Sequence, residues 1–430
     1  MTRNRWVYPL YNLLLIVSLP IICLFVLVKW RQRIFSKGGE NWAERWGRLS
    51  PETQAHFAGP RKRWWWVHAV SMGEVKAIET FLRRTPASAD VKILLSAVTP
   101  EALAWAREKN LADVIIAAPL DLPWIVRRIF HIVRPEIFVS VESEFWPNLL
   151  REARRSGACV ALINGRISAR SYRSYSRIRS LLDALWETLD LFAVRQPEDA
   201  ERFAALGVPP EKIAVTGNLK YDLYMERRAQ KRSSAEAPVV VMGSTREGEE
   251  SQLLPALERV RVQVPQVRII WAPRHIERVP ELESLLKAHG LAYELISQLR
   301  LSSNGSTAHA PYLLWDSMGD LLDAYRQADV AVVGGSFVPK GGQNPIEPAA
   351  LRLPVLFGPS MDNFQGVADT MVRSGGARQV SIENLDSHLS SLLQNPAICH
   401  DMGERAQQAV VAEQGATERT LNLLKGLPRA

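Results

Sequence analysis

The chain has 430 residues, of which 47% are hydrophobic and 23% are charged. This length and composition exclude a disordered chain and favour two folded domains with an appendage. The net charge of +8 favours an anionic partner. Because no nucleic-acid motif accompanies the dispersed positive charges, we expect a membrane surface or a phosphorylated substrate and no nucleic acid. The three cysteines have no metal-binding spacing, which argues against a disulfide framework or a zinc site.

The N-terminal segment Val7–Val28 is apolar and has the length of roughly 20 residues that a membrane-spanning helix needs. The heavier positive flank, residues 29–37, follows it, so we expect the rest of the chain on the cytoplasmic side. No small-residue cleavage site follows the segment, which favours an uncleaved anchor over a signal peptide. Pro9 and Pro20 leave open whether the anchor spans the bilayer or lies in its surface.

From Trp64 onward, short apolar runs alternate with amphipathic stretches. The expected strands are Trp64–Val70, Val91–Val98, Val114–Ala117, Ile137–Val141, Cys159–Ile163, Leu191–Val194, Val239–Met242, Val267–Trp271, Leu291–Leu295, Tyr312–Trp315, Val330–Val333 and Val355–Phe357. This rhythm predicts two α/β domains with parallel sheets, joined by the charged linker Arg227–Pro238. A cleft between the two domains is the expected ligand site.

Glu74 ends a stretch, His68–Glu74, in which an expected strand runs into a small-residue turn. A glutamate in the first turn of a helix is often only a partner of the helix dipole, and this alternative stays open. As a functional residue, Glu74 would lie at the carboxyl end of a parallel strand, where ligands bind. There it is suited to remove a proton from a hydroxyl group.

Glu142 and Glu144 follow a very apolar strand, where carboxylates are costly unless they are solvated, paired or used in chemistry. In extended geometry the two side chains point the same way, so we expect at least one to feel the charge of the other. The structural alternative is that one caps the next helix while the other meets an arginine such as Arg166. We favour a functional role because the pair lies in the expected cleft.

Two basic residues occupy comparable positions. Lys220, at the end of the first domain, is suited to stabilise a phosphate across the cleft, although a lysine there is commonly only surface charge. Arg274 leaves an expected strand beside a helix start, which is a favourable place for phosphate. The chain has no Asp-x-Asp pair of the kind that holds a divalent ion against a sugar diphosphate, so we expect no metal site and no cofactor.

Gly334–Pro348 is a glycine-rich turn after a strand, followed by the expected start of a helix. Its two Gly-Gly pairs allow the backbone to approach a ligand closely, Asn344 is a good N-cap, Pro345 suits the first helical turn, and Glu347 lies within that turn. This pattern is typical of a nucleotide cradle, and an ordinary strand-to-helix loop is the alternative.

Seven segments carry a family resemblance: His68–Glu74, Glu142–Asn148, Asn164–Ser168, Gly217–Asp222, Gly243–Glu249, Pro273–Glu277 and Gly334–Pro348. In this order they resemble the bacterial 3-deoxy-D-manno-octulosonic acid (Kdo) transferases of lipopolysaccharide synthesis, and the match runs from the N-terminal segment to the last helices. The resemblance implies a GT-B fold, which consists of two Rossmann-like domains facing across a cleft. With the anchor, it suggests an N-terminal membrane helix at 1–36, an acceptor-binding domain at 37–228, a donor-binding domain at 229–400, and C-terminal helices at 401–430 able to pack back on the N-terminal domain.

The resemblance also implies the reaction and its residues. The donor is CMP-Kdo and the acceptor a lipid A precursor of the lipid IVA type, and transfer inverts the anomeric configuration at the cytoplasmic face of the inner membrane. Glu74 is implied as general base, with Glu142 and Lys220 supporting the transition state. The implied donor contacts are Pro273, Arg274, Met318, Gly319, Asp320, Asn344, Pro345, Ile346 and Glu347. The chain departs from the usual family pattern at Gln343, Asp320 and Gly165.

Two other functions stay open at this point. A GT-B glycosyltransferase that uses a UDP-sugar for another membrane lipid shares the fold and the anchor. A membrane-bound sensor of nucleotide sugars would bind the donor without forming a product.

Overall fold

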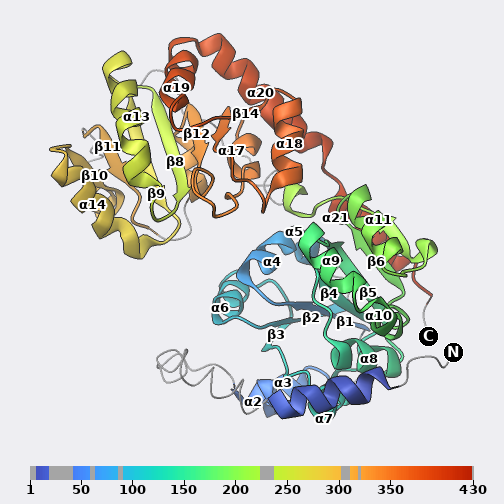
Figure 1. Ribbon diagram of the computed structural model, residues 1–430. Coiled ribbons are helices and arrows are strands. Elements are labelled where there is room, and N and C mark those ends of the chain that lie inside the picture. Colours follow the sequence, from blue (N-terminus) through green and yellow to red (C-terminus); the bar gives the residue numbers. More distant parts are fainter. Residues whose placement is uncertain are drawn as a thin grey trace. The chain divides into compact units, whose positions relative to one another are not determined.

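The computed structural model describes residues 6–18, 42–58, 63–85, 91–222, 237–301, 310–317 and 321–428. The chain divides into two compact units, unit 1 with Met1–Leu223 and Gln414–Ala430, and unit 2 with Tyr224–Glu413. Each unit is a parallel sheet with helices around it (Figure 1). The boundary that the sequence suggested, at residues 228 and 229, lies outside the described residues.

Unit 1 contains a seven-stranded parallel sheet in the order β3-β2-β1-β4-β5-β6-β7. Its strands are β1 (Arg63–Ala69), β2 (Val91–Ala97), β3 (Val114–Ala117), β4 (Ile137–Val141), β5 (Cys159–Gly165), β6 (Leu191–Val194) and β7 (Ile213–Val215). The first six confirm the expected strands to within two residues at either end. The edge strand β7 was missed because it is short and only partly buried, and so lacks a long apolar run.

Both faces of this sheet are buried, as expected for a parallel sheet covered by helices. Side chains alternate along β1, so that Trp65 and Val67 lie in one hydrophobic cluster while Trp64 and Trp66 lie in the other. Because both faces of β1 are buried, the sequence Arg63–Ala69 is apolar at most positions. Two cores on opposite faces hold the carboxyl ends of the strands in fixed register.

Helices surround the sheet of unit 1, and several of them begin with a proline, whose fixed φ suits the first helical turn. They are α2 (Trp42–Arg45), α3 (Pro51–Ala55), α4 (Met72–Ala77), α5 (Glu79–Arg84), α6 (Pro100–Glu108), α7 (Pro123–Val133), α8 (Pro147–Arg155), α9 (Ala169–Ser176), α10 (Arg179–Trp186), α11 (Pro197–Ala205) and α21 (Ala416–Lys425).

The C-terminal helix α21 belongs to unit 1. Leu421 and Leu424 are buried in the same cluster as Trp65 of β1. The buried carboxylate of Asp222 accepts the backbone N–H of Gly415 at 2.8 Å, and that of Thr417 at 2.6 Å. The end of the chain is thus fixed to unit 1 by both apolar packing and a capping carboxylate.

Unit 2 repeats the architecture with a different strand order, β10-β11-β9-β8-β12-β13-β14, and every neighbouring pair is again parallel. The strands are β8 (Val239–Thr245), β9 (Arg268–Pro273), β10 (Tyr293–Leu295), β11 (Tyr312–Leu314), β12 (Val330–Val333), β13 (Val355–Phe357) and β14 (Ala377–Gln379). The helices are α13 (Glu250–Gln263), α14 (Val279–Ala288), α15 (Ile296–Leu301), α16 (Leu321–Arg326), α17 (Ile346–Ala350), α18 (Gln365–Arg373), α19 (Leu385–Gln394) and α20 (Pro396–Ala412).

In each sheet the chain first adds strands toward one edge and then crosses to the other side of its first strand, where it adds the remaining strands. We call the position between the first strand and its neighbour on that other side the reversal point. In unit 1 this point lies between β1 and β4, and in unit 2 it lies between β8 and β12. The crevice outside the carboxyl ends of the strands at such a point is where open parallel sheets bind ligands. The fold therefore marks one candidate ligand edge in each unit.

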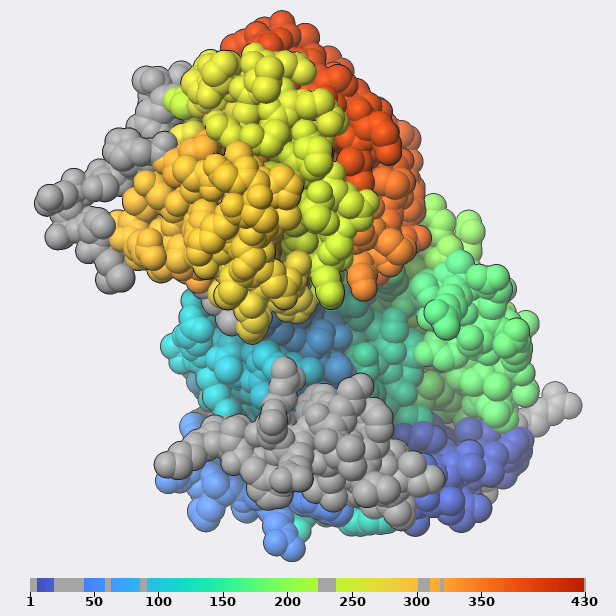
Figure 2. Space-filling view, turned by 60° about the vertical axis from the view of Figure 1, so that its left-hand side comes forward, coloured from blue at the N-terminus to red at the C-terminus, as the bar shows by residue number. Residues whose placement is uncertain are grey.

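The N-terminal helix, residues 7–18, lies along the outside of unit 1 (Figures 1 and 2, dark blue). The hydroxyl of Tyr8 donates to the carbonyl of Ala184 at 3.1 Å, and the hydroxyl of Tyr11 donates to Asp121 at 2.9 Å. The side chain of Asn12 accepts a hydrogen bond from that of Asn148 at 2.7 Å. These contacts hold one face of the helix against the domain.

The opposite face of this helix is apolar and exposed. Leu13, Leu14 and Val17 are 60%, 60% and 63% exposed. Across the ranges that the structure describes, no helix is long and apolar enough to cross a bilayer. Residues 19–41, which hold the rest of the expected anchor, lie outside those ranges.

Candidate functional site

Glu74 and Glu142 follow the two strands that flank the reversal point of unit 1. Strand β1 ends at Ala69 and leads into α4, which carries Glu74, while β4 ends at Val141, directly before Glu142. Strands β1 and β4 pair with each other. The fold thus brings two carboxylates that are far apart in sequence to one ligand edge.

Glu74 lies in the first turn of α4, as expected, and it also helps to cap that helix. Its carboxylate accepts the backbone N–H of Val70 at 2.7 Å and the hydroxyl of Ser71 at 2.9 Å. The Ser71 hydroxyl in turn accepts the backbone N–H of Glu74, in a variant of the capping box. These contacts fix the orientation of the carboxylate.

The pKa of Glu74 is raised to about 7. Burial is the largest cause, since only 9% of the residue is exposed, and the charges of Glu142 and Glu144 add to it. The hydrogen bonds from Val70 and Ser71 oppose the shift. A carboxylate whose pKa lies near neutral pH and whose orientation is fixed has the properties of a general base.

Glu142 behaves in the opposite way. Burial acts to raise its pKa, but the positive charges of Arg195, Lys220 and Arg166 outweigh burial, and the pKa lies below its ordinary value. Its carboxylate forms an ion pair with Arg195 and lies 3.7 Å from the ammonium of Lys220. The ionised form of Glu142 is therefore favoured by the two cations that contact it, Arg195 and Lys220.

Two details differ from the sequence-based expectation for this glutamate pair. Glu142 does not continue the strand, because its φ of 60° is left-handed. The arginine that pairs with it is Arg195, which follows β6, and not Arg166. The sequence analysis named Arg166 only as an example of such an arginine, whereas the sheet order brings Arg195 to the carboxylate.

The structural alternative, in which one of the two glutamates caps the next helix, does not hold for Glu144. Its carboxylate accepts the indole N–H of Trp146 at 2.8 Å. Helix α8 is capped instead by Asp121, which accepts the backbone N–H groups of Asn148 and Leu149 at 3.1 and 2.7 Å. Burial raises the pKa of Glu144, and the charge of Glu142 adds to that shift, as expected for neighbouring carboxylates.

The glycine-rich segment lies at the reversal point of unit 2, directly after β12. Gly334 is required by the chain itself, since a Cβ on this residue would lie 2.6 Å from the Cα of Thr245. The sequence-based interpretation explained these glycines by the approach of a ligand. At Gly334 the close approach is between the backbones that follow β8 and β12.

Glu249 braces this segment from the start of α13. It is fully buried, and its carboxylate accepts backbone N–H groups from Arg246, Gly335, Ser336 and Phe337 at 2.7–3.1 Å. Burial raises its pKa, and the bonds from Gly335, Phe337 and Arg246 oppose that shift. One carboxylate thereby fixes the shape of two neighbouring loops at this edge.

The helix in the glycine-rich segment begins one residue later than expected. Pro345 is the N-cap of α17, which starts at Ile346, so that the expectation of Asn344 as N-cap is corrected. The side chain of Asn344 nevertheless accepts the backbone N–H of Ile346 at 3.1 Å and donates to Glu347 at 3.3 Å. Because proline offers no side-chain acceptor, the asparagine before it supplies one.

The other implied donor contacts of unit 2 are only partly described. Pro273 ends β9, and the exposed Arg274 follows it, with its backbone N–H bonded to the carbonyl of Thr245 at 3.0 Å. Arg246 lies beside it and contacts His275 at 2.9 Å. These basic groups gather at the ends of β8 and β9. The implied contacts at residues 318–320 (Met318, Gly319 and Asp320) lie outside the described residues.

Comparison with known proteins identifies the family. A family model described as "3-Deoxy-D-manno-octulosonic-acid transferase (kdotransferase)" matches residues 40–223. The 3-deoxy-D-manno-octulosonic acid transferase of Bordetella pertussis is 33% identical over 436 residues, which cover 96% of this chain and 98% of the relative. The chain belongs to the Kdo transferase family. The 3-deoxy-D-manno-octulosonic acid transferase of Haemophilus influenzae is 29% identical, and the match covers 96% of this chain and 97% of that relative.

This Kdo transferase family member also resembles solved structures in fold. A UDP-GlcNAc 2-epimerase from Neisseria meningitidis bound to UDP-GlcNAc matches 85% of this chain and 100% of its own with a TM-score of 0.59 and 11% identity. MurG from Acinetobacter baumannii matches the same shares with a TM-score of 0.52 and 14% identity. These likenesses support two Rossmann-like α/β units of the GT-B kind, and at such identities they concern the fold alone.

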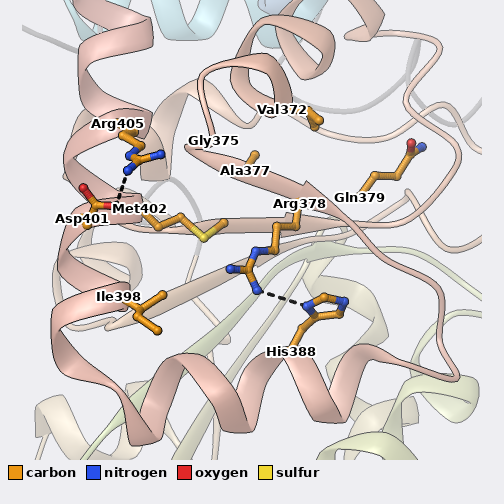
Figure 3. A pocket seen from close by; sticks show the side chains of 10 residues that line it. All are labelled: Val372, Gly375, Ala377, Arg378, Gln379, His388, Ile398, Asp401, Met402 and Arg405. Carbon is orange, nitrogen blue, oxygen red and sulfur yellow. Dashed lines mark hydrogen bonds and ion pairs between the residues drawn. The ribbon is translucent and has the colours of Figure 1, made fainter.

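A groove in unit 2 lies apart from the residues that the family resemblance implies (Figure 3). It has a volume of about 490 Å³ and is lined by Val372, Gly375, Ala377, Arg378, Gln379, His388, Ile398, Asp401, Met402 and Arg405. Its charged groups contact one another, Arg378 with His388 at 3.3 Å and Arg405 with Asp401 at 2.8 Å. The groove lies along β14, the edge strand of the sheet, and is not at the reversal point.

Sequence reasoning missed three residues that shape the site of this Kdo transferase, Arg195, Glu249 and Asp121. Arg195 follows a short strand as a single basic residue, and only the pairing of β5 with β6 brings it near Glu142. Glu249 ends the segment Gly243–Glu249 that carries part of the resemblance, but no sequence pattern indicates that its carboxylate accepts backbone N–H groups of another loop. Within the described ranges, no group of three or more His, Cys, Asp or Glu side chains is arranged to hold a metal ion.

Proposed function

We propose that this protein transfers Kdo from CMP-Kdo to a lipid A precursor with inversion of the anomeric configuration, and that Glu74 is the general base. The observation that carries the proposal is the position of Glu74, a well-oriented carboxylate with a pKa of about 7 at the reversal point of unit 1. Membership in the Kdo transferase family supplies the transferred sugar and the reaction class.

In the proposed step, Glu74 takes the proton of an acceptor hydroxyl while the oxygen forms a bond to the anomeric carbon of Kdo. The bond between that carbon and the phosphate oxygen of CMP breaks, and CMP leaves with the electron pair. Because the attacking oxygen enters opposite the leaving group, the configuration at the anomeric carbon is inverted.

Glu142 and Lys220 act as a charged pair beside this base. The negative charge of Glu142 favours the positive charge that develops on the sugar, and Lys220 stabilises the phosphate of the leaving group. The 3.7 Å separation between their charged atoms supports a joint role, since each charge favours the ionised form of the other. Burial nevertheless lowers the pKa of Lys220, and the charge of Glu142 opposes that shift.

The donor nucleotide is assigned to unit 2. Pro273, Arg274 and the segment from Asn344 to Glu347 follow the strands beside its reversal point, and the resemblance assigns the CMP contacts to them. The guanidinium group of Arg274 is exposed and suited to a phosphate. The proposed reaction thus draws on groups of both units.

We also propose that the protein works at the surface of the inner membrane, with both units on the cytoplasmic side. The exposed apolar face of the N-terminal helix, with Leu13, Leu14 and Val17, supports this placement, as does the positive flank at residues 29–37. An enzyme held at the surface reaches the sugar hydroxyl of an acceptor whose acyl chains stay in the bilayer.

The test is a product assay with the full chain purified in detergent. A lipid A precursor is supplied with CMP-Kdo, and in parallel with UDP-sugars, and the lipid fraction is analysed by mass spectrometry. We expect a mass increase of whole Kdo units with CMP-Kdo only, and NMR of the product should show the inverted anomer. Product formed from a UDP-sugar instead would establish the alternative glycosyltransferase, and donor binding without any product would establish the sensor.

A further inference from the structure

A cluster of basic side chains lies beside Glu142 at the ligand edge of unit 1. Arg166 follows β5, Arg195 follows β6, and Lys220 lies shortly after β7, so that they sit beyond the carboxyl ends of three consecutive strands of the sheet. With Arg202 on α11, four cations face only two carboxylates, Glu142 and Asp199. The cluster therefore carries an excess of positive charge when all its members are ionised.

Both carboxylates of the cluster are already engaged. Glu142 pairs with Arg195, whose side chain is only 10% exposed and also donates from Nε to the carbonyl of Asn164 at 3.2 Å. Asp199 accepts the backbone N–H of Ile167 at 2.9 Å. Asp199 also pairs with Arg202 at 3.9 Å, so that the two carboxylates act on Arg166 by electrostatic attraction alone, without an ion-pair contact.

Arg166 differs from the other cations of the cluster. Within the described ranges its guanidinium takes part in no hydrogen bond or ion pair, although the residue is half-buried. Arg202, by contrast, donates to the carbonyl of Ile167 at 2.7 Å. Burial lowers the pKa of Arg166 and repulsion by Arg195 adds to the effect, which the attraction of Glu142 and Asp199 opposes but does not cancel.

The backbone around Arg166 is fixed even though its side chain is not. The carbonyl of Arg166 accepts the hydroxyl of Ser143, which lies next to Glu142. The next residue, Ile167, is 1% exposed and bonds to Asp199. A rigid backbone that presents an unpaired guanidinium at a ligand edge is the arrangement that recognises a carboxylate or a phosphate.

We propose that Arg166 binds an anionic group of the substrate at this edge, with Arg195 reserved for positioning Glu142. The ligand is a compact oxyanion, which is either the carboxylate of the transferred octulosonic acid or a phosphate of the lipid acceptor. The identity of the substrate rests on the proposed function, but the recognition of an oxyanion by Arg166 does not.

The first experiment compares inorganic phosphate binding by the full chain in detergent for the wild type, Arg166→Gln, Arg166→Lys and Arg170→Gln. Arg170 is exposed on α9, four residues from Arg166. The substitution Arg170→Gln removes the same charge and is therefore the matched control. At constant ionic strength, phosphate should raise the unfolding temperature of the wild type and of Arg170→Gln more than that of Arg166→Gln. Arg166→Lys should lie between them. An equal shift in all four proteins would overturn the proposal.

The second experiment measures KM for each substrate separately. Because a charge-assisted contact is lost, Arg166→Gln should raise one KM by about 10- to 100-fold, while Arg170→Gln leaves both unchanged. A rise confined to CMP-Kdo identifies the sugar carboxylate, and a rise confined to the acceptor identifies its phosphate. Unchanged values for both substrates would contradict the proposal.

Folding and function can be separated in these tests. Within the described residues Arg166 has no hydrogen bond to lose, and burial with repulsion by Arg195 outweighs the attraction of Glu142 and Asp199. Without phosphate, Arg166→Gln should therefore unfold at the same temperature as the wild type or slightly higher. If the wild type itself forms no Kdo product, the proposed function fails while the phosphate experiment still reports on Arg166. If the wild type is active and Arg166→Gln matches it in every measurement, only the present inference fails.

Discussion

The reversal points of the two units use carboxylates in opposite ways. In unit 2, Glu249 is fully buried and accepts four backbone N–H groups, so its oxygens are saturated and its role is to shape the loops. In unit 1, Glu74 receives one backbone N–H and one hydroxyl and keeps 9% exposure, with a pKa of about 7. The same position in one fold therefore fixes the shape of the loops in unit 2 and, in unit 1, holds the carboxylate that we propose as the base.

A second contrast lies within unit 1. Glu74 and Glu142 follow paired strands, yet the pKa of Glu74 is raised and that of Glu142 is lowered. Burial acts on both in the same direction, and the difference comes from the cations that only Glu142 contacts. Two carboxylates with diverging pKa values are suited to distinct roles, which we propose to be a base for Glu74 and a fixed charge for Glu142.

The largest expected effect is the loss of the base. Glu74→Gln keeps the shape of the side chain and removes the carboxylate, so kcat should fall by about 10²- to 10⁴-fold. Binding of CMP, measured by calorimetry, should be unchanged, because the nucleotide contacts are assigned to unit 2. Turnover near that of the wild type would remove Glu74 from the role of base.

The next effect tests the structural carboxylate of unit 2. Glu249→Gln places an amide N–H₂ against backbone N–H donors, which should destabilise the unit by about 1–3 kcal/mol and raise the KM for CMP-Kdo. Thermal unfolding and steady-state kinetics measure the two effects. The control is Glu247→Gln, an exposed residue two positions away, which should change neither. If Glu249→Gln behaved like the control, the contrast between the units would not hold.

The pH dependence sharpens the comparison further. Because Glu74 must be ionised to act, kcat/KM should rise about tenfold per pH unit below pH 7 and level off above it. The effect on stability has the opposite sign. A carboxyl whose pKa rises from 4.5 to about 7 on folding makes the folded state less stable as the pH increases across that window. Glu74→Gln should abolish both dependences, and a rate profile that is flat between pH 5 and 8 would argue against the assignment.

The smallest effect concerns the attachment of the N-terminal helix. Tyr11→Phe removes the hydroxyl that donates to Asp121, a hydrogen bond that contributes about 1 kcal/mol. We expect the unfolding temperature of unit 1 to fall by about 2–4 °C in detergent, with kcat unchanged. Tyr172→Phe removes a hydroxyl for which the structure records no hydrogen bond and serves as the control. A loss of activity as large as that of Glu74→Gln would show that the helix contributes directly to the reaction.

The sequence by itself determined the elements and the family. Apolar runs such as Ile137–Val141 and Val330–Val333 predict buried strands in this chain, because strands buried on both faces are apolar at almost every position. The ordered motifs led to the Kdo transferases and to Glu74, Glu142 and Lys220 as site residues. The elements and the motifs could be recognised because each depends on residues that are close together in the chain, whereas the roles of the three site residues are implied by the resemblance and stay predictions.

Only the tertiary structure decided which charged groups meet. Arg195 reaches Glu142 because β6 lies two strands from β4, and Asp121 caps α8 from the loop after β3. The pairing of side chains at strand ends depends on the order of strands in the sheet, which no local pattern specifies. For the same reason, the raised pKa of Glu74 and the unpaired guanidinium of Arg166 became visible only when burial and neighbouring charges were known.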